Sequence, residues 1–183
     1  MTKRISKIRF RAKLLQPAII AKTATWTFLT LPRNASAKLP SRGMTSVEGT
    51  MNGIQFCATL EPDGQKGHWL KVNEKLRKSA GAKVSDVVML EIAPMAMEPE
   101  PKVPADLRKA LAAAPKARAL WSEITPVARR DWIQWITSGK RAETRALRIG
   151  KACSMLSAGK RRICCFDRSG FYNKSLSAPL PAI

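Results

Sequence analysis

Apolar and basic residues alternate strictly near the start of the chain. Between positions 8 and 14 the even positions are apolar and the odd positions are basic. The members are Ile8, Phe10, Ala12 and Leu14 on one side and Arg9, Arg11 and Lys13 on the other. A period of two predicts a strand with one buried face and one basic face. Residues 26–31, stopped by Pro32, and the β-branched stretch 83–92 predict two further strands.

The Asn52-Gly53 pair predicts a tight hairpin, because a type I′ turn needs positive φ at both central positions. The turn sets a register in which Met51 faces Ile54, Gly49 faces Phe56 and Val47 faces Ala58. The other face then carries Thr50 opposite Gln55 and Glu48 opposite Cys57. One register thus sorts both strands into an apolar face and a mostly polar face.

Turn and cap residues complete the first half. Residues 33–43 have the composition of a loop, and Pro62-Asp63-Gly64 marks a turn before a short strand over 69–72. Asn73 is a good N-cap for a helical turn that ends at Gly81. Ser85 and Asp86 are residue types that favour turns, so we expect a turn at this pair. The first half therefore predicts a small β-barrel with one short helix.

The period changes to 3.6 after a proline-rich stretch at 93–103. Pro104 suits the start of a helix, and Thr125-Pro126 combines an N-cap with a proline at the first helical position. A longer helix follows from about Lys140 to Gly159. We predict an α+β chain: a barrel over 1–92, a linker over 93–103, a helical hairpin or bundle over 104–160 and an irregular tail over 161–183.

The formal net charge of +20 favours an acidic partner, such as nucleic acid, an anionic surface or an acidic protein. No stretch is long and apolar enough to span a membrane. The opening residues lack a secretory signal, so we expect a cytoplasmic protein with reduced cysteines. The patterns leave open whether it is a monomer or a homodimer.

Signals for catalysis are sparse. The chain has no phosphate-binding glycine loop and no nucleophile elbow, and its acidic residues are scattered. His68 is the single histidine, in a predicted turn, where it is either solvated or packed. The cysteines show no metal-ligand spacing; Cys153 lies on an apolar helix stripe, and Cys164 and Cys165 are adjacent in the tail. We therefore expect that the protein is not an enzyme and that it has no cofactor and no metal site.

Two basic stripes are the candidate contacts for an anion or nucleic acid. One is on the first strand and the other on the last helix, where a solvated helix face is the simpler interpretation. Their members are Arg9, Arg11 and Lys13 in the strand, and Arg141, Arg145, Arg148 and Lys151 in the helix. Trp132 and Trp135 could stack on bases, although their positions on the apolar face favour core packing.

Several motifs occur together in order. In the first half they are FRAKL at 10–14, WTFLTLP at 26–32, RGMTSVEGTMNGIQFCATLEPDG at 42–64, HWLKVNEKLRKSAG at 68–81 and SDVVML at 85–90. In the second half they are VPADLRKAL at 103–111, ITPVARRDWIQWI at 124–136 and SGKRAETRALRIGKACSMLSAGKR at 138–161.

The first set resembles a small bacterial β-barrel family of unknown function, which implies a double-split barrel related to the AbrB and MazE group. The second set resembles the YdeI/OmpD-associated helical domain, whose name implies bacteriocin protection. The resemblance covers about residues 5–162 and brings no catalytic residues. It implies a non-enzymatic binding or stress-protection protein, and a nucleic-acid-binding protein is the alternative.

Overall fold

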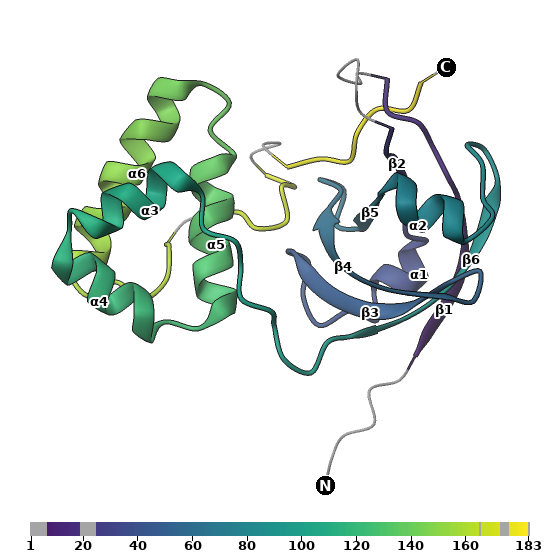
Figure 1. The fold of residues 1–183 in the computed structure, drawn as a ribbon, viewed down its shortest axis with the longest axis horizontal. Helices are drawn as coiled ribbons and strands as arrows, with labels where there is room; N and C mark the ends of the chain where they lie inside the picture. Colours follow the sequence, from purple (N-terminus) through teal and green to yellow (C-terminus); the bar gives the residue numbers. More distant parts are fainter. Residues whose placement is uncertain (1–6, 19–24, 165, 173–175, 183) are drawn as a thin grey trace, which may run out of the picture. The chain divides into compact units, whose positions relative to one another are not determined.

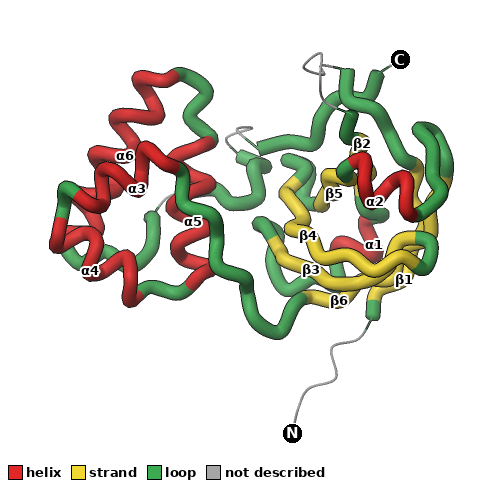
Figure 2. The backbone as a smooth tube through the Cα atoms, viewed as in Figure 1, coloured by secondary structure: helices red, strands yellow, loops and turns green. Residues whose placement is uncertain are grey.

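The computed structural model describes residues 7–18, 25–164, 166–172 and 176–182. The chain divides into two compact units (Figure 1). The barrel unit comprises residues 1–96 and 167–183, and the helical unit comprises residues 97–166. The first unit contains all the described strands and two short helices (Figure 2). The described elements of the second unit are all helices. The predicted α+β class is therefore confirmed.

Six antiparallel strands form the barrel, in the order β1-β6-β3-β4-β5-β2. A bridge between Leu15 and Phe28 then links the end of β1 to β2, so the sheet almost closes on itself. The strands are β1 (Ile8–Lys13), β2 (Thr27–Thr30), β3 (Thr45–Met51), β4 (Ile54–Pro62), β5 (His68–Val72) and β6 (Val87–Pro94).

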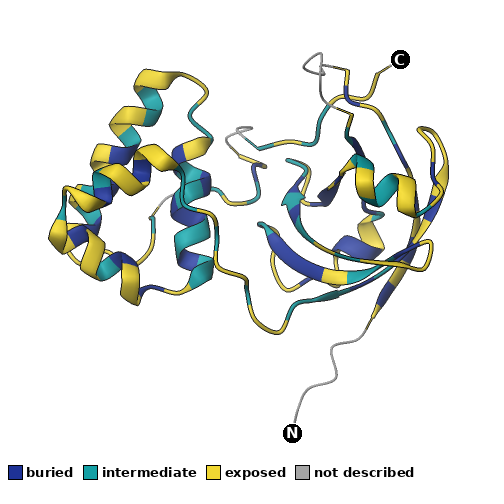
Figure 3. Ribbon diagram, viewed as in Figure 1, coloured by how far each residue is buried: buried dark blue, intermediate teal, exposed yellow. Residues whose placement is uncertain are grey.

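The alternation in β1 is confirmed. Ile8, Phe10 and Ala12 are buried in the barrel core, whereas the basic residues between them are exposed. Leu90 and Ile92 of the neighbouring strand β6 are buried in the same cluster. Figure 3 shows this change from buried to exposed positions along the strands. The sheet therefore has a packed inner face and a solvent-exposed outer face.

The Asn52-Gly53 hairpin has the predicted register along its whole length, from Met51 opposite Ile54 to Val47 opposite Ala58. Asn52 and Gly53 have φ angles of 49° and 85°, as a type I′ turn requires. Because the turn geometry fixes the pairing locally, two residues were sufficient to predict it.

Some boundaries differ from the prediction, and two of these differences have a clear physical reason. Residues 33–43 are not all loop, because Arg33–Ser36 form the short helix α1, whose single turn is too brief to show a period. The strand predicted from residue 83 begins at Val87. Ser85 has a φ of 74°, and Asp86 accepts a hydrogen bond from the Lys83 amide at 2.7 Å, so the preceding residues form the turn expected of this pair.

The caps of helix α2 (Glu74–Ser79) are confirmed. The Asn73 side chain accepts a hydrogen bond from the Leu76 amide at 2.8 Å. Gly81 follows the helix with a φ of 62°, which a residue without a Cβ adopts at little cost.

The helical unit packs its four helices around one apolar cluster. The helices are α3 (Ala105–Ala112), α4 (Pro115–Glu123), α5 (Pro126–Thr137) and α6 (Ala142–Ser157). Thr125 caps α5 by accepting a hydrogen bond from the Ala128 amide at 3.3 Å. The described helices include none that is long and apolar enough to cross a membrane.

The described residues of the tail, 166–172 and 176–182, include no helix, and the tail from Asp167 onward belongs to the barrel unit. The amide of Ala18 donates to the carbonyl of Leu180, and the amide of Ala182 donates to the carbonyl of Gln16, both at 2.7 Å. Gly64 lies so close to this segment that a Cβ there would be 2.7 Å from the Leu176 carbonyl oxygen. Backbone pairing, which needs no side-chain period, therefore holds the tail.

Candidate binding face of the barrel

The outer face of β1 and β6 brings the first predicted stripe into one row of side chains. In the antiparallel register, Arg9 is opposite Glu91, Arg11 is opposite Met89 and Lys13 is opposite Val87. Facing residues on one side of a sheet have Cβ atoms about 5 Å apart, so each cation has a β6 side chain as its direct neighbour. The three predicted strand residues therefore differ in their surroundings.

Glu91 neutralises one end of this row. Its carboxylate pairs with Lys7 at 2.6 Å and also with Arg9. Hydrogen bonds from Lys7 and from Arg9 lower the pKa of the Glu91 carboxyl below its usual value. Arg9 is therefore already engaged, and a partner carboxylate or phosphate would have to compete with Glu91 for it.

The other end of the row combines charge with exposed apolar surface. Arg11 and Lys13 are exposed, and the structure gives neither of them an ion pair within its described residues. Their cross-strand neighbours Met89 and Val87 are 43% and 64% exposed. We call these four residues the basic-apolar patch. Such a mixture can contact carboxylates and apolar side chains of one partner at the same time.

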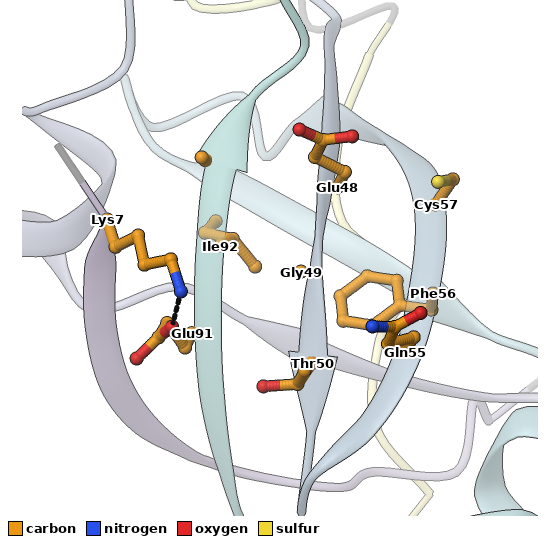
Figure 4. Close-up of a pocket in the computed structure, with 10 residues that line it drawn as sticks. Lys7, Glu48, Gly49, Thr50, Gln55, Phe56, Cys57, Glu91 and Ile92 are labelled. Atoms are coloured by element: carbon orange, nitrogen blue, oxygen red, sulfur yellow. Dashed lines mark ion pairs between the residues drawn. The ribbon is translucent and has the colours of Figure 1, made fainter. Parts of the chain in front are cut away.

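A hollow of about 550 Å³ lies beside the Lys7–Glu91 pair (Figure 4). It spans β6, β3 and β4, and its polar lining includes Glu48, Thr50, Gln55 and Cys57. Strands β3 and β6 approach closely at Gly49, where a Cβ would be 2.0 Å from the Glu91 carbonyl oxygen. The glycine keeps the floor of the hollow flat, because any other residue would push the strands apart.

The second predicted stripe, on α6, is divided between internal contacts and solvent. Arg145 forms a two-point pair with Asp106 of α3, with the Nε to Oδ2 distance at 2.6 Å and Nη2 to Oδ1 at 3.1 Å. Arg148 donates to the Trp135 carbonyl at 2.6 Å and to the Ser138 hydroxyl at 2.8 Å, at the end of α5. Both arginines hold helices together.

The remaining two members of the α6 stripe, Arg141 and Lys151, are exposed. The pair with Arg145 lowers the pKa of the Asp106 carboxyl to about 2. The stripe thus has two cations in solvent, Arg141 at the N-cap of α6 and Lys151 within the helix, and two that a ligand could reach only by breaking existing contacts.

The two tryptophans of α5 lie on the helical core. Trp132 is fully buried, and its ring meets the edge of Trp135 with centroids 6.1 Å apart. The Arg148 guanidinium lies 5.4 Å from the centroid of the Trp135 ring. Core packing is therefore confirmed for Trp132, because a base could not reach its ring.

His68 lies at the start of β5 rather than in a turn, and it is fully buried. Its Nε2 lies 3.0 Å from the Gly43 carbonyl oxygen and therefore donates to it, so Nδ1 accepts from the Ser36 hydroxyl at 2.6 Å. Burial lowers the pKa of the imidazole below 6.5. The packed alternative is correct, and the ring joins β5 to α1 and to the loop before β3.

The cysteines remain apart within the part of the chain that the structure describes. Cys57 and Cys164 are exposed, whereas burial raises the pKa of the half-buried Cys153 thiol. Cys165 lies outside the described residues. Among the residues that are described, no three of His, Cys, Asp or Glu come together as metal ligands.

Sequence reasoning missed the β6 side of the binding face. Val87, Met89 and Glu91 occupy alternate positions of a strand that was recognised, but strand order was unknown. Val87 and Met89 alternate with the buried Val88 and Leu90, so the uninterrupted apolar run concealed which positions face solvent.

Two family models match the chain. Residues 10–92 match the model described as Domain of unknown function (DUF1905). Residues 100–159 match OmdA, described as Bacteriocin-protection, YdeI or OmpD-Associated. No curated protein matches the chain. The resemblance inferred from the motifs is therefore confirmed for both halves.

Proposed function

We propose that this chain, in which a DUF1905 domain precedes an OmdA domain, is a non-enzymatic binding protein for an acidic partner. The partner would contact the basic-apolar patch on the outer face of β1 and β6. The description of the second domain names protection from bacteriocins. Binding of an acidic protein segment is one way to contribute to such protection, and a net charge of +20 disfavours direct capture of a cationic peptide.

The observation that carries the proposal is the composition of the patch. Arg11 and Lys13 are exposed cations, and Val87 and Met89 expose apolar side chains directly beside them. Large exposed apolar side chains next to unshared charges are typical of protein contact surfaces. An extended segment that alternates acidic and apolar residues would match both kinds of side chain, because its own period is two.

The surroundings of two titratable groups, His68 and Glu91, also support binding over catalysis at these positions. A general acid or base works best with a pKa near the working pH and with access to its substrate. His68 is buried with both ring nitrogens hydrogen-bonded, and Glu91 is held in its charged form by Lys7 and Arg9. Both groups serve the structure of the barrel and its face.

The proposal is tested with a labelled peptide that alternates glutamate and valine. Reversing both charges with Arg11→Glu and Lys13→Glu should weaken binding by about thirtyfold, since two lost contacts of roughly 1 kcal/mol each add up to about 2 kcal/mol. Replacing both apolar residues with Val87→Ser and Met89→Ser should weaken it by about threefold to tenfold. Fluorescence anisotropy measures both effects.

A matched control distinguishes the patch from net charge alone. Arg108→Glu with Lys109→Glu on α3 changes two exposed cations of the helical unit by the same total charge. Peptide binding by this variant should equal that of the wild type. A loss as large as that of the β1 variant would contradict the proposal, and so would an absence of peptide binding by the wild type.

Removing the Glu91 carboxylate should have the opposite sign. Glu91→Gln frees Lys7 and Arg9 from their ion pairs, so the face gains two available cations. We expect the glutamate-valine peptide to bind about threefold to tenfold more tightly at low salt, and the gain to shrink as salt screens it. Titrations at low and high ionic strength check this, and weaker binding would show that Glu91 itself supports the site.

Nucleic acid binding is the second candidate, because Arg11, Lys13, Arg141 and Lys151 are exposed. Phosphate neutralisation predicts that log affinity for duplex DNA falls with log salt, by about 0.9 per phosphate contact. The serine variants of Val87 and Met89 should then have no effect, since phosphates make no use of apolar side chains. This result separates the two candidates.

A further inference from the structure

Helix α6 has one face that the helical unit leaves bare. Its opposite side packs Ile149, Ala152 and Leu156 into the core. The bare face consists of residues spaced by three or four, and every member is exposed. They are Glu143, Ala146, Leu147, Gly150, Lys151 and Ser154, and they line a shallow hollow of about 680 Å³. We call these six residues the α6 face.

The apolar part of the α6 face lies outside the apolar core of the helical unit. Leu147 is 67% exposed, the second largest exposure among the described large hydrophobic residues of this unit. Gly150 sits in the middle of the helix, where glycine costs about 1 kcal/mol relative to alanine. A Cβ at Gly150 would meet no atom within 4 Å, so no neighbour within the described chain requires the glycine. A leucine beside a missing side chain suits close approach by another helix.

The charges of the α6 face indicate which kind of partner could pack against it. Glu143 lies four residues before Leu147 and Lys151 four residues after it, about one turn on either side. Neither Glu143 nor Lys151 forms an ion pair with another described residue of the chain. A second copy of α6 in antiparallel orientation, with a twofold axis at Leu147, would place Glu143 opposite Lys151 of the partner subunit, twice. Parallel pairing would set like charges side by side.

We propose that the α6 face is the contact through which two copies of this chain associate, antiparallel about Leu147. The face carries one charge of each sign, so two molecules of net charge +20 can meet there without local repulsion. Leu147 packs against its own symmetry mate and over Gly150 of the partner subunit. The contact uses no residue of the basic-apolar patch, so it is independent of the proposed partner binding.

Charge reversals test the register of the pair in the full-length chain. Glu143→Lys and Lys151→Glu alone should each weaken dimerisation by about tenfold or more, because each creates two like-charge contacts. An equimolar mixture of the two variants should regain the dimer, since every contact then joins opposite charges and the mean net charge equals that of the wild type. Sedimentation velocity over a concentration series measures all three.

Leu147→Asp should abolish the dimer, whereas Lys116→Glu, a reversal at an exposed position of α4, should leave it intact. Circular dichroism verifies that each variant keeps its helices. A wild-type chain that is monomeric at every concentration overturns the proposal, including the case in which another part of the same chain covers the face. A dimer that survives Leu147→Asp, or that the mixture fails to restore, also overturns it.

Discussion

Replacing His68 with alanine is expected to lower the free energy of unfolding of the barrel by about 3 kcal/mol. The ring is fully buried and bridges the Ser36 hydroxyl at 2.6 Å and the Gly43 carbonyl at 3.0 Å. The substitution leaves the Ser36 hydroxyl buried without its partner, and it removes the shortest of the side-chain hydrogen bonds to the Gly43 carbonyl, which still accepts from Thr45 and Ser41. An unpaired buried group costs about 1–3 kcal/mol, and the cavity adds to this loss. Chemical denaturation at neutral pH, followed by tryptophan fluorescence, measures the loss.

The same residue should make barrel stability depend on pH. Burial holds the pKa of folded His68 below 6.5, so the unfolded chain binds a proton first as the pH falls. Stability contributed by the neutral ring is therefore complete above pH 6.5 and decreases from that pH downward. Denaturation at several pH values between neutral and mildly acidic should show this decrease in the wild type and a flatter profile in His68→Ala.

Ser36→Ala is the matched control for the hydrogen-bond argument. It removes one partner of the ring and keeps the other, so its cost should be about 1 kcal/mol. The cost of the double variant should be less than the sum of the single costs, because the two side chains contact each other. Additive effects, or an unchanged pH profile in His68→Ala, would contradict the role assigned to the ring.

Replacing Trp132 with alanine should destabilise the helical unit by about 4 kcal/mol, the largest effect we expect in the chain. The indole is fully buried among α3–α6 residues, and its removal leaves a large cavity. Thermal unfolding followed by far-ultraviolet circular dichroism measures the change, and the helical signal should melt earlier while the barrel transition is unaffected.

Phenylalanine at position 132 separates packing from polarity. The Trp132 Nε1 atom is buried and has no hydrogen-bond partner within the described residues. Trp132→Phe should therefore retain much of the stability that Trp132→Ala loses, because a second ring still fills the space. Equal losses in the two variants would mean that the indole N–H makes a contact essential to the unit.

Local rules predicted much of the fold. Alternation gave β1, the Asn52-Gly53 turn gave the hairpin register, and Thr125 and Asn73 gave the starts of two helices. Each of these features depends on residues a few positions apart. The helix α1 escaped prediction because four residues contain too little of a 3.6-residue period, and the start of β6 was misplaced because a turn interrupts the β-branched stretch.

Only the β1 side of the candidate binding face could be predicted from the sequence. Alternation in β1 identified Arg9, Arg11 and Lys13 as an exposed row, but β6 lies more than seventy residues away in the chain. Strand pairing decides that Glu91 neutralises Arg9 and that Met89 and Val87 flank the two remaining cations. At α6 the spacing predicted a stripe of four basic residues, but contacts with α3 and α5 engage two of them, Arg145 and Arg148.

The sequence by itself determined the two-part α+β architecture, the basic strand face and the absence of familiar catalytic motifs, because hydrophobic period, turns and caps act over a few residues. The tertiary structure alone decided which charges are free, which apolar residues face solvent and what His68 contacts. Those properties depend on which distant segments become neighbours, and packing of the whole chain selects them by burying apolar surface and satisfying the polar groups it encloses.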